Sequence, residues 1–319
     1  MSLDILTLGE ALVEVMRTEI DQPLDRPALF TGPYPSGAPF IFAMQAARLD
    51  AQVAAIGAVG SDAFGRCLLD QLELDGVDTR GVSVLDTHTT GVAFVAYNGD
   101  GSRDFVFHIA QAAGGQITES IIDESLFDGL KCLHLMGSTL SISPDVLRAG
   151  LRALELAERA GAKFSFDPNL RPELLSAEHA RVAFAPFIAA ADVIIPTADE
   201  LLLLTGAADL NAAIDGLLAD RPGRVIVVTQ GAAGCTVYTE QGAQQVPGFP
   251  VEEVDPTGAG DCFDAGFLAR WLAGDEPARA AAFANACGAL AVTAKGPAEG
   301  ARKRDQVLAF MAQHNRNDD

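Results

Sequence analysis

A short run in the last quarter of the chain has the composition of a phosphate-binding turn. Asp255–Asp261 reads Asp-Pro-Thr-Gly-Ala-Gly-Asp, and apolar residues with helical spacing follow from Phe263 to Leu272. The three small residues Gly258–Gly260 stand between a strand-like run, Val251–Val254, and the start of that helix. Their backbone N–H groups can converge on one anion, and the helix dipole strengthens the attraction. The sequence therefore predicts an anion-binding turn here.

Asp261 falls in the first turn of the predicted helix. A carboxylate at that position is ordinarily stabilised by the helix dipole and does nothing else. Beside a bound phosphate it could also take the proton from a hydroxyl that attacks the phosphorus. The turn alone does not decide between these interpretations, because a tight strand-to-helix connection uses the same small residues.

Other nucleotide and metal motifs are missing from the sequence. None of the lysines follows a glycine, so there is no Walker A loop, and Gly258-Ala259-Gly260 lacks the third glycine of a dinucleotide fingerprint. A nicotinamide-dependent oxidoreductase is disfavoured for that reason. The five cysteines and five histidines show no metal-ligand spacing.

The charge balance excludes two classes of partner. The chain has 319 residues, with 22 Lys and Arg against 43 Asp and Glu, giving a formal net charge of −21. Nucleic acid and anionic membranes both require clustered cations, so we expect neither as a partner. The N-terminus lacks a basic region and the longest apolar run, 280–294, contains Asn285, so we expect a cytoplasmic protein.

Short apolar runs separated by helical stretches predict a doubly wound, mostly parallel α/β sheet flanked by helices. The expected strands are Ile5–Leu8, Val53–Val59, Cys132–Met136, Lys163–Phe166, Val193–Ile195 and Val225–Thr229. The main expected helices are 40–49, 144–160, 177–189, 210–218, 263–272, 278–294 and 306–313. We assign 1–12, 36–87 and 111–319 to this core.

Two segments, 13–35 and 88–110, do not follow this alternation of short apolar strands and helices. The first holds proline-rich turns between strand-like pieces, and the second has Asn98-Gly99-Asp100-Gly101 between two β-rich runs. Asn-Gly and Asp-Gly between such runs are strong hairpin signals. We predict that the two segments form a small β-sheet lid on the core, although two ordinary surface excursions would give the same pattern.

With these elements in place, the chain resembles the ribokinase-like (PfkB) carbohydrate kinases. Asp255–Asp261 resembles their D-x-T-G-A-G-D signature, and the resemblance continues in order over most of the chain. The other matching segments are Gly37–Leu49, Ile56–Gly65, Asp167–Arg171 and Val227–Gly234. Details of Asp167–Arg171 and of 32–42 are most similar to the fructokinase, 2-keto-3-deoxygluconate kinase and tagatose kinase branch.

The resemblance implies ATP-dependent transfer of a γ-phosphoryl group to a primary hydroxyl of a sugar or sugar acid. By position, Asp261 would be the catalytic base, and the amides of Gly258, Ala259 and Gly260 would form the anion hole. The nucleotide side would comprise Thr229, Gly231, Gly234 and Asn285. Glu200 would help to place Mg²⁺ through water, and Asp255 could neighbour a monovalent cation such as K⁺.

On the sugar side the family's positions imply five candidate substrate-binding residues: Glu14, Gly37, Arg103, His108 and Arg171. Each charged candidate has a plainer interpretation as a surface ion-pair residue, and His108 could be a half-buried strand histidine. The lid of such kinases often contacts a second subunit, so the resemblance also implies a homodimer through the lid.

The chain departs from the family pattern at sugar-contacting positions. Ile41 and Thr197 replace two asparagines of the family motifs, and His108 replaces the arginine that helps to bind a sugar carboxylate. The reaction class is therefore predicted more firmly than the sugar. A nucleoside-type kinase of the same fold and a non-catalytic sugar-sensing relative stay open as alternatives, and the second should lack the acid at 261.

Overall fold

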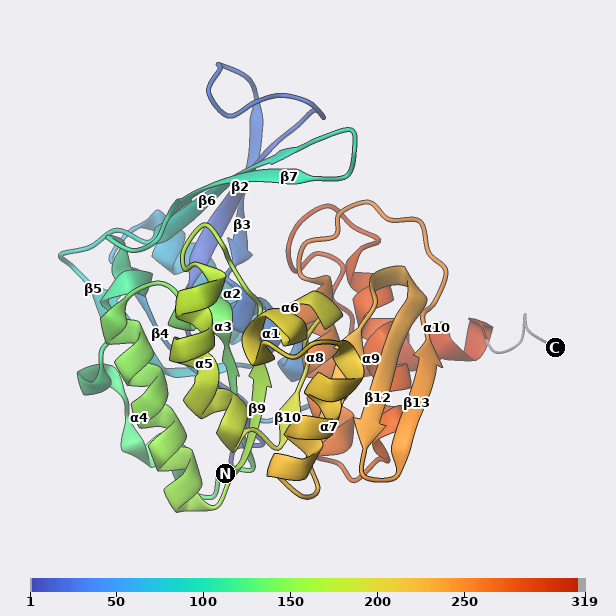
Figure 1. Ribbon diagram of the computed structural model, residues 1–319. Helices are drawn as coiled ribbons and strands as arrows, with labels where there is room; N and C mark the ends of the chain where they lie inside the picture. The colour runs from blue at the N-terminus through green and yellow to red at the C-terminus, as the bar shows by residue number, and fades with distance from the viewer. Residues whose placement is uncertain (1, 315–319) are drawn as a thin grey trace.

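The computed structural model describes residues 2–314 and contains a nine-stranded central sheet with helices on both faces (Figure 1). The strand order is β13-β12-β11-β10-β9-β8-β1-β4-β5. The seven strands from β11 to β5 pair in parallel, and the edge hairpin β12–β13 is antiparallel. The strands are β1 Ile5–Leu8, β4 Val53–Gly60, β5 Asp78–Leu85, β8 Cys132–Met136, β9 Lys163–Asp167, β10 Val193–Ile194, β11 Val225–Thr229, β12 Gly234–Thr239 and β13 Gly242–Pro247.

Two separate apolar cores sandwich this sheet. Leu6 and Leu8 of β1 face one core, which contains apolar residues of α4 to α7, whereas Ile5 faces the other core, with α1, α2, α8 and α9. Alternate residues of a strand point to opposite faces, so a continuous apolar run fills both cores. The helices are α1 Ala38–Arg48, α2 Ala63–Asp75, α3 Gly137–Leu140, α4 Pro144–Ala160, α5 Ala177–Ala190, α6 Ala198–Thr205, α7 Leu210–Asp220, α8 Ala259–Trp271, α9 Pro277–Ala291 and α10 Arg304–His314.

The chain reverses direction across the sheet between β1 and β8. From β1 it moves outward to β4 and β5, and then returns to β8 on the other side of β1. In doubly wound sheets the crevice outside the carboxyl ends of the strands at such a switch point is where ligands bind. The residues that follow β1, β8 and β9 therefore become candidates for the site.

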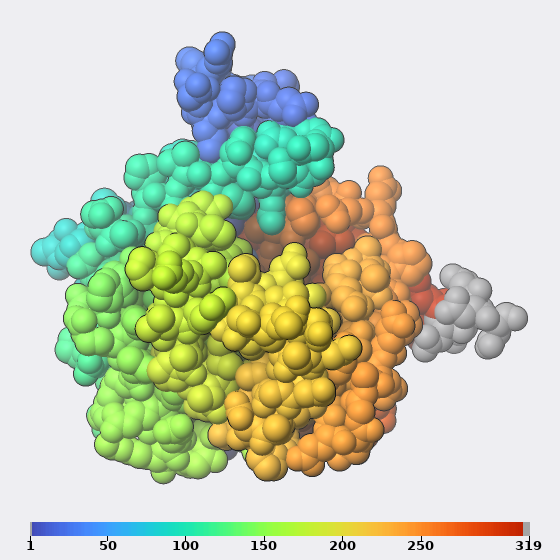
Figure 2. Space-filling view, in the orientation of Figure 1, coloured from blue at the N-terminus to red at the C-terminus, as the bar shows by residue number. Residues whose placement is uncertain are grey.

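A second sheet, which we call the lid sheet, lies over the carboxyl edge of the central sheet (Figure 1). Its order is β3-β2-β6-β7, with β2 and β6 parallel and the outer pairs antiparallel. The strands are β2 Leu12–Arg17, β3 Phe30–Ser36, β6 Gly91–Tyr97 and β7 Arg103–His108. Figure 2 shows a hollow below the lid sheet, between the surfaces of the middle and C-terminal parts of the chain.

The α/β class and most of the expected elements are confirmed, but one expected strand is missing, and β5, α2, α3, α6 and the hairpin β12–β13 were not expected. Val251–Val254, expected as a strand before the anion-binding turn, is irregular: Val254 is exposed, and its amide bonds only to the carbonyl of Val292 at 2.8 Å. The hairpin β12–β13 was not expected, because its outer strand is mostly polar and exposed. In residues 2–314 no single helix is long and apolar enough to cross a membrane, although α6 and α7 pass that test as a pair bent by 67°.

Candidate active site

The main cavity, of about 480 Å³, lies between the carboxyl edge of the central sheet and the lid sheet. Segments that follow five parallel strands line it, so it occupies the crevice that the topology indicates. These strand-end residues are Glu10, Ser138, Asp167, Thr197 and Thr229. We call Thr257–Asp261 the phosphoryl end of the cavity, and Glu10, Glu14, Ser36, Gly37 and the inner face of β7 the sugar end.

The phosphoryl end is built mainly from backbone. Gly258 is the N-cap of α8 with a φ of 80°, and a Cβ there would lie 2.1 Å from the carbonyl oxygen of Pro297. Only glycine fits both the left-handed conformation and this close approach. The first N–H groups of a helix have no acceptor within it, and Gly258–Gly260 all line the cavity. The turn can therefore offer its amides to an anion.

Asp261 lies beside that turn, with its residue 8% exposed and lining the cavity. Burial raises the pKa of its carboxyl to about 7, against a smaller lowering by the charge of Arg171. The charges of Glu10 and Glu14 raise the pKa further. Near neutral pH the group can thus accept a proton and later release it, as a general base requires.

Glu14 places a second carboxylate at the sugar end. Ser36 Oγ donates to its Oε1 at 2.6 Å, while its buried Oε2 has no partner among the described residues. Burial raises the pKa of this carboxyl to about 7. An unpaired buried oxygen is costly, so Oε2 is suited to a ligand hydroxyl.

Glu10 is a functional candidate that our sequence analysis missed. It directly follows β1 and Gly9, where it is buried and lines the cavity. Thr139 Oγ1 and Ser138 Oγ donate to it at 2.5 and 3.4 Å, and burial raises its pKa. An acid directly after a buried strand near the switch point was the signal that could have found it.

Gly37 lies between these two acids and the first turn of α1. Its φ is 103°, and a Cβ at this position would lie 2.2 Å from the carbonyl oxygen of Glu10. The backbone of the two segments therefore meets here without side-chain bulk, and Gly37 lines the cavity as expected. Ile41, which replaces the family's asparagine, also lines it and brings an apolar surface instead of an amide.

Arg103 and Arg171 bring positive charge to the cavity. Arg103, on β7, donates from Nη1 to Thr257 Oγ1 at 2.8 Å, so it links the lid sheet to the phosphoryl end. Arg171 follows β9 and is exposed, and its Nη1 donates to the carbonyl of Leu170 at 3.3 Å. Both residues line the cavity, and both lower the pKa of Asp261 and of Glu14.

His108 does not occupy the place that we expected for a sugar contact. It is exposed and packs edge-on against Phe94, with ring centroids 6.1 Å apart, on the face of the lid sheet turned away from the cavity. Arg103, Phe105 and Phe107 of the same strand line the cavity. Alternate strand residues face opposite ways, so the prediction that His108 contacts the sugar together with Arg103 is wrong.

The nucleotide-side candidates are only partly brought together. Thr229, at the end of β11, lines the main cavity, but Gly231, Gly234 and Asn285 do not. Gly231 and Gly234 lie in the turn that starts β12. Asn285 Nδ2 donates to the carbonyls of Val246 and Pro247 at 3.1 and 3.0 Å, which ties α9 to the end of β13. Their role in nucleotide binding stays a prediction.

Glu200 lines the cavity, yet its carboxylate already has several partners. Oε2 accepts from the N–H and Oγ1 of Thr197, both at 2.9 Å, and completes a capping box on α6. Oε1 accepts from the N–H of Leu170 at 2.8 Å and so fixes the loop that carries Arg171. A carboxylate so fixed could still accept from a water on Mg²⁺, which fits the indirect role that we expected.

Asp255 is fully buried below the phosphoryl end and accepts hydrogen bonds on both oxygens. Oδ1 accepts from the N–H of Thr257 at 3.0 Å, and Oδ2 accepts from Tyr97 Oη at 2.8 Å and the N–H of Gly296 at 2.9 Å. These donors explain how Asp255 shapes the loop. A monovalent cation beside it stays a prediction, and residues 2–314 contain no cluster of three metal-ligating side chains.

Two further acids lie at the floor of the cavity, and the sequence analysis gave neither of them a role. Asp167 and Asp264 are both buried and line the cavity near Asp261. Burial, together with the neighbouring carboxylates, raises the pKa of both well above the ordinary range. Two neighbouring buried carboxyls do not both ionise readily, which limits the negative charge gathered around the phosphoryl end.

Solved structures with the same fold carry nucleotides. The E. coli protein named "putative Ribokinase II", solved in complex with ATP and Mg²⁺, is 40% identical, with a TM-score of 0.93 over 98% of this chain and all of that chain. The Vibrio cholerae O395 fructokinase, solved with fructose, ADP and calcium ion bound, is 30% identical, with a TM-score of 0.82 over 97% and 99%. The fold and the site thus define an ATP-dependent carbohydrate kinase.

Sequence comparison leads to the same family. Residues 4–304 match the pfkB family of carbohydrate kinases. "Probable fructokinase-7" of Arabidopsis thaliana is 36% identical over 320 residues, which cover 97% of this chain and 92% of that protein. "Fructokinase-1" of Oryza sativa subsp. japonica is 34% identical and covers 96% of this chain and 97% of its own length. The chain belongs to the pfkB family of carbohydrate kinases.

Proposed function

We propose that the protein phosphorylates a primary hydroxyl of a free, uncharged ketose. The observation that carries the proposal is the pair of buried acids at the sugar end, Glu10 and Glu14, opposite the amide-lined turn and Asp261. Carboxylates accept hydrogen bonds from several sugar hydroxyls at once, whereas they would repel a carboxylate substrate. Fructokinases among the relatives and solved structures support a ketose.

In this mechanism Asp261 takes the proton as the sugar hydroxyl attacks the γ-phosphorus of ATP in line. The amides of Gly258, Ala259 and Gly260 bind the charge that spreads over the transferring oxygens. Mg²⁺, when bound with ATP, neutralises phosphate charge, and Glu200 would hold it through water. The lid sheet covers the cavity and keeps water from replacing the sugar as acceptor.

One observation favours a sugar acid as a second candidate. Arg171 lines the cavity, where its Nη1 donates to the carbonyl of Leu170, and its guanidinium could pair with the carboxylate of a 2-keto-3-deoxy acid. His108 cannot fill the role of the family's carboxylate-binding arginine, because it faces away. The acidic sugar end therefore outweighs Arg171 in our proposal.

The test is a panel of acceptors with ATP and Mg²⁺, read as ADP release. It should contain ketoses, the matching aldoses, 2-keto-3-deoxy acids and ribosides. We expect the largest kcat/KM for a ketose. A sugar acid or a riboside as the best acceptor would overturn the ketose assignment. If no acceptor in the panel stimulated ADP release, the proposed sugar kinase activity itself would be refuted.

A homodimer through the lid sheet also stays a prediction, which sedimentation can check.

A further inference from the structure

An irregular segment between α9 and α10, residues 296–303, supports the phosphoryl end from behind. The carbonyl of Pro297 lies so close to Gly258 that a Cβ on Gly258 would be 2.1 Å from it. The N–H of Gly296 donates to Asp255, whose other oxygen accepts from the N–H of Thr257. Close-packed backbone of this kind transmits displacement, so the position of the segment limits where the turn can lie.

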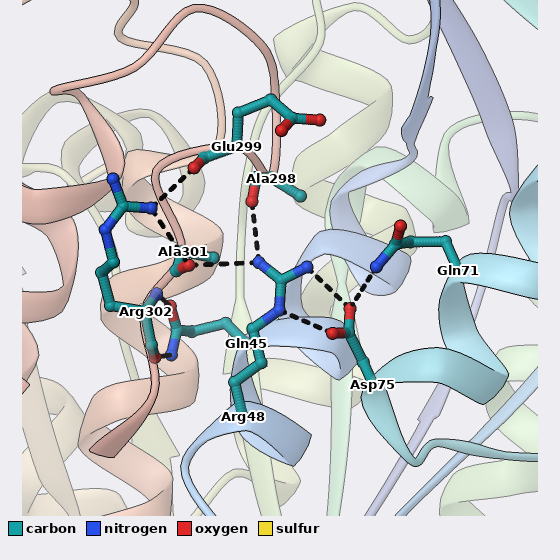
Figure 3. Close-up of polar contacts among 8 residues, drawn as sticks. All are labelled: Gln45, Arg48, Gln71, Asp75, Ala298, Glu299, Ala301 and Arg302. Carbon is teal, nitrogen blue, oxygen red and sulfur yellow. Dashed lines mark hydrogen bonds and ion pairs between the residues drawn. The ribbon is translucent and has the colours of Figure 1, made fainter. Parts of the chain in front are cut away.

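Arg48, in the last turn of α1, holds this segment in place (Figure 3). Its Nε and Nη2 donate to the two carboxylate oxygens of Asp75 at 2.8 and 2.7 Å. Its Nη1 donates to the carbonyls of Ala298 and Ala301 at 2.8 and 3.1 Å. Asp75, at the end of α2, thus fixes the plane of the guanidinium, and Nη1 stays free to bind the carbonyls of the segment.

Gln45, one turn earlier on α1, makes a second connection (Figure 3). Its Nε2 donates to the carbonyl of Arg302 at 2.9 Å, and its Oε1 accepts from the N–H of Arg302 at 3.1 Å. Gln45 is fully buried, so this reciprocal pair is shielded from water. The two side chains together bind three residues of the segment by their backbone, which leaves it little freedom.

The chemistry of the contact is specific to these side chains. A guanidinium can bind a carboxylate with two donors while a third donor reaches backbone carbonyls, and a lysine ammonium cannot reproduce this planar fork. Arg48 and Asp75 are both mostly buried, with 16% and 10% of their side chains exposed. Neither Arg48 nor Gln45 lines the main cavity.

We propose that Arg48 and Gln45 are positioning residues for phosphoryl transfer. Through residues 297–303 they hold the Gly258–Gly260 turn where its amides can meet the transferring phosphoryl group. The inference rests on the role proposed above for that turn. Since a displacement of about 1 Å in a catalytic group can cost about 100-fold in rate, loss of either residue should lower kcat more than it changes substrate binding.

The experiment compares Arg48→Gln, Arg48→Lys and Gln45→Met with Arg270→Gln. Arg270 makes a similar pair with Asp275, at 2.7 and 2.6 Å, with 20% and 15% of the side chains exposed, at the far end of α8. At a temperature where circular dichroism shows all variants folded, we expect Arg48→Gln to lower kcat about 10- to 100-fold with both KM values within about twofold. Arg48→Lys should recover part of the loss, and Arg270→Gln should keep its kcat.

A second readout separates positioning from a merely structural role. Aluminium fluoride with ADP mimics the planar phosphoryl group in flight, so its inhibition should weaken in Arg48→Gln by about the factor lost in kcat, while ADP alone binds as before. A kcat like that of Arg270→Gln, or equal losses for ADP and for the mimic, would overturn the inference. If Gly258→Ala also kept its kcat, the proposed role of the turn itself would fall. A loss in Gly258→Ala without one in Arg48→Gln would refute the positioning role alone.

Discussion

The two ends of the cavity are built in opposite ways. The phosphoryl end is one contiguous stretch, Thr257–Asp261, that works mainly through backbone amides at the start of α8. The sugar end gathers Glu10 after β1, side chains of β2, β3 and β7, and the backbone at Gly37, so its members come from several separate elements. One fold can therefore keep its reaction constant while its acceptor changes. One short glycine-containing turn builds the phosphoryl end, whereas the acids at the sugar end act through their individual side chains.

Each end also contains a buried acid whose pKa burial raises to about 7, namely Asp261 and Glu14. The similarity hides different tasks. Asp261 adjoins the amides that would hold the phosphoryl group, so its proton matters for turnover. Glu14 bonds to Ser36 and presents a free oxygen to the sugar, so it matters for binding. Substitutions of the two acids should therefore change different kinetic constants.

Replacing Asp261 by asparagine should lower kcat about 1000-fold and change both KM values by less than about threefold, because the amide cannot take the hydroxyl proton. A coupled assay of ADP release measures both parameters. Asp199→Asn is the matched control, since Asp199 also lies in the first turn of a helix but is exposed. Near-normal turnover in Asp261→Asn would show that Asp261 is not the catalytic base. The proposed difference in task between Asp261 and Glu14 would then be refuted as well.

Lowering the pH should have the next largest effect. Burial raises the pKa of Asp261 to about 7, so the base becomes protonated, and inactive, as the pH falls through that value. We expect kcat/KM for the sugar to fall by about tenfold for each pH unit below about 7. A pH profile of initial rates tests this, and an unchanged rate down to about pH 5 would show that no such group governs the reaction.

Glu14→Gln should raise KM for the sugar about tenfold and change kcat much less, because a hydrogen bond to a charged group is worth about 1.5–3 kcal/mol. Glutamine can keep the bond from Ser36 but loses the free carboxylate oxygen. Steady-state kinetics at varied sugar concentration gives the two constants. If kcat fell instead while KM stayed constant, Glu14 would belong with the phosphoryl end.

The smallest effect is expected for His108→Gln, which should change kcat and KM by less than about twofold because the side chain is exposed on the outer face of the lid sheet. Arg103→Gln on the same strand is the comparison, and we expect it to change both constants several times more, since Arg103 bonds to Thr257. Equal effects of the two substitutions would mean that the two faces of β7 do not differ in function.

The phosphoryl end could be predicted from sequence because contiguous residues suffice to build it. Gly258–Gly260 and Asp261 need only a helix to follow them, and the apolar spacing after Phe263 supplies that signal. The irregular shape of Val251–Val254 did not matter for this result. Likewise, the parallel core followed from continuous apolar runs, each of which fills both faces of the sheet.

The sugar end could not be predicted to the same depth, because its members meet only after folding. Glu10 looked like the end of a strand, and Asp167 and Asp264 gave no signal that they would share one buried floor. His108 was a different kind of failure. The parity of β7 alone places His108 and Arg103 on opposite faces, so the period of the strand already contained the correct answer.

The way the lid sheet is threaded has a consequence for how the chain reaches its final form. Its central strands β2 and β6 pair in parallel, although α1, β4, α2 and β5 lie between them in the sequence. Pairing of such distant strands requires closure of a long loop, which has a large entropy cost while the chain between them is unfolded. The intervening helices and strands should therefore form first. Hydrogen exchange during refolding should therefore show the lid strands acquiring protection after β1 and β4, which makes the cover of the cavity the last part to assemble.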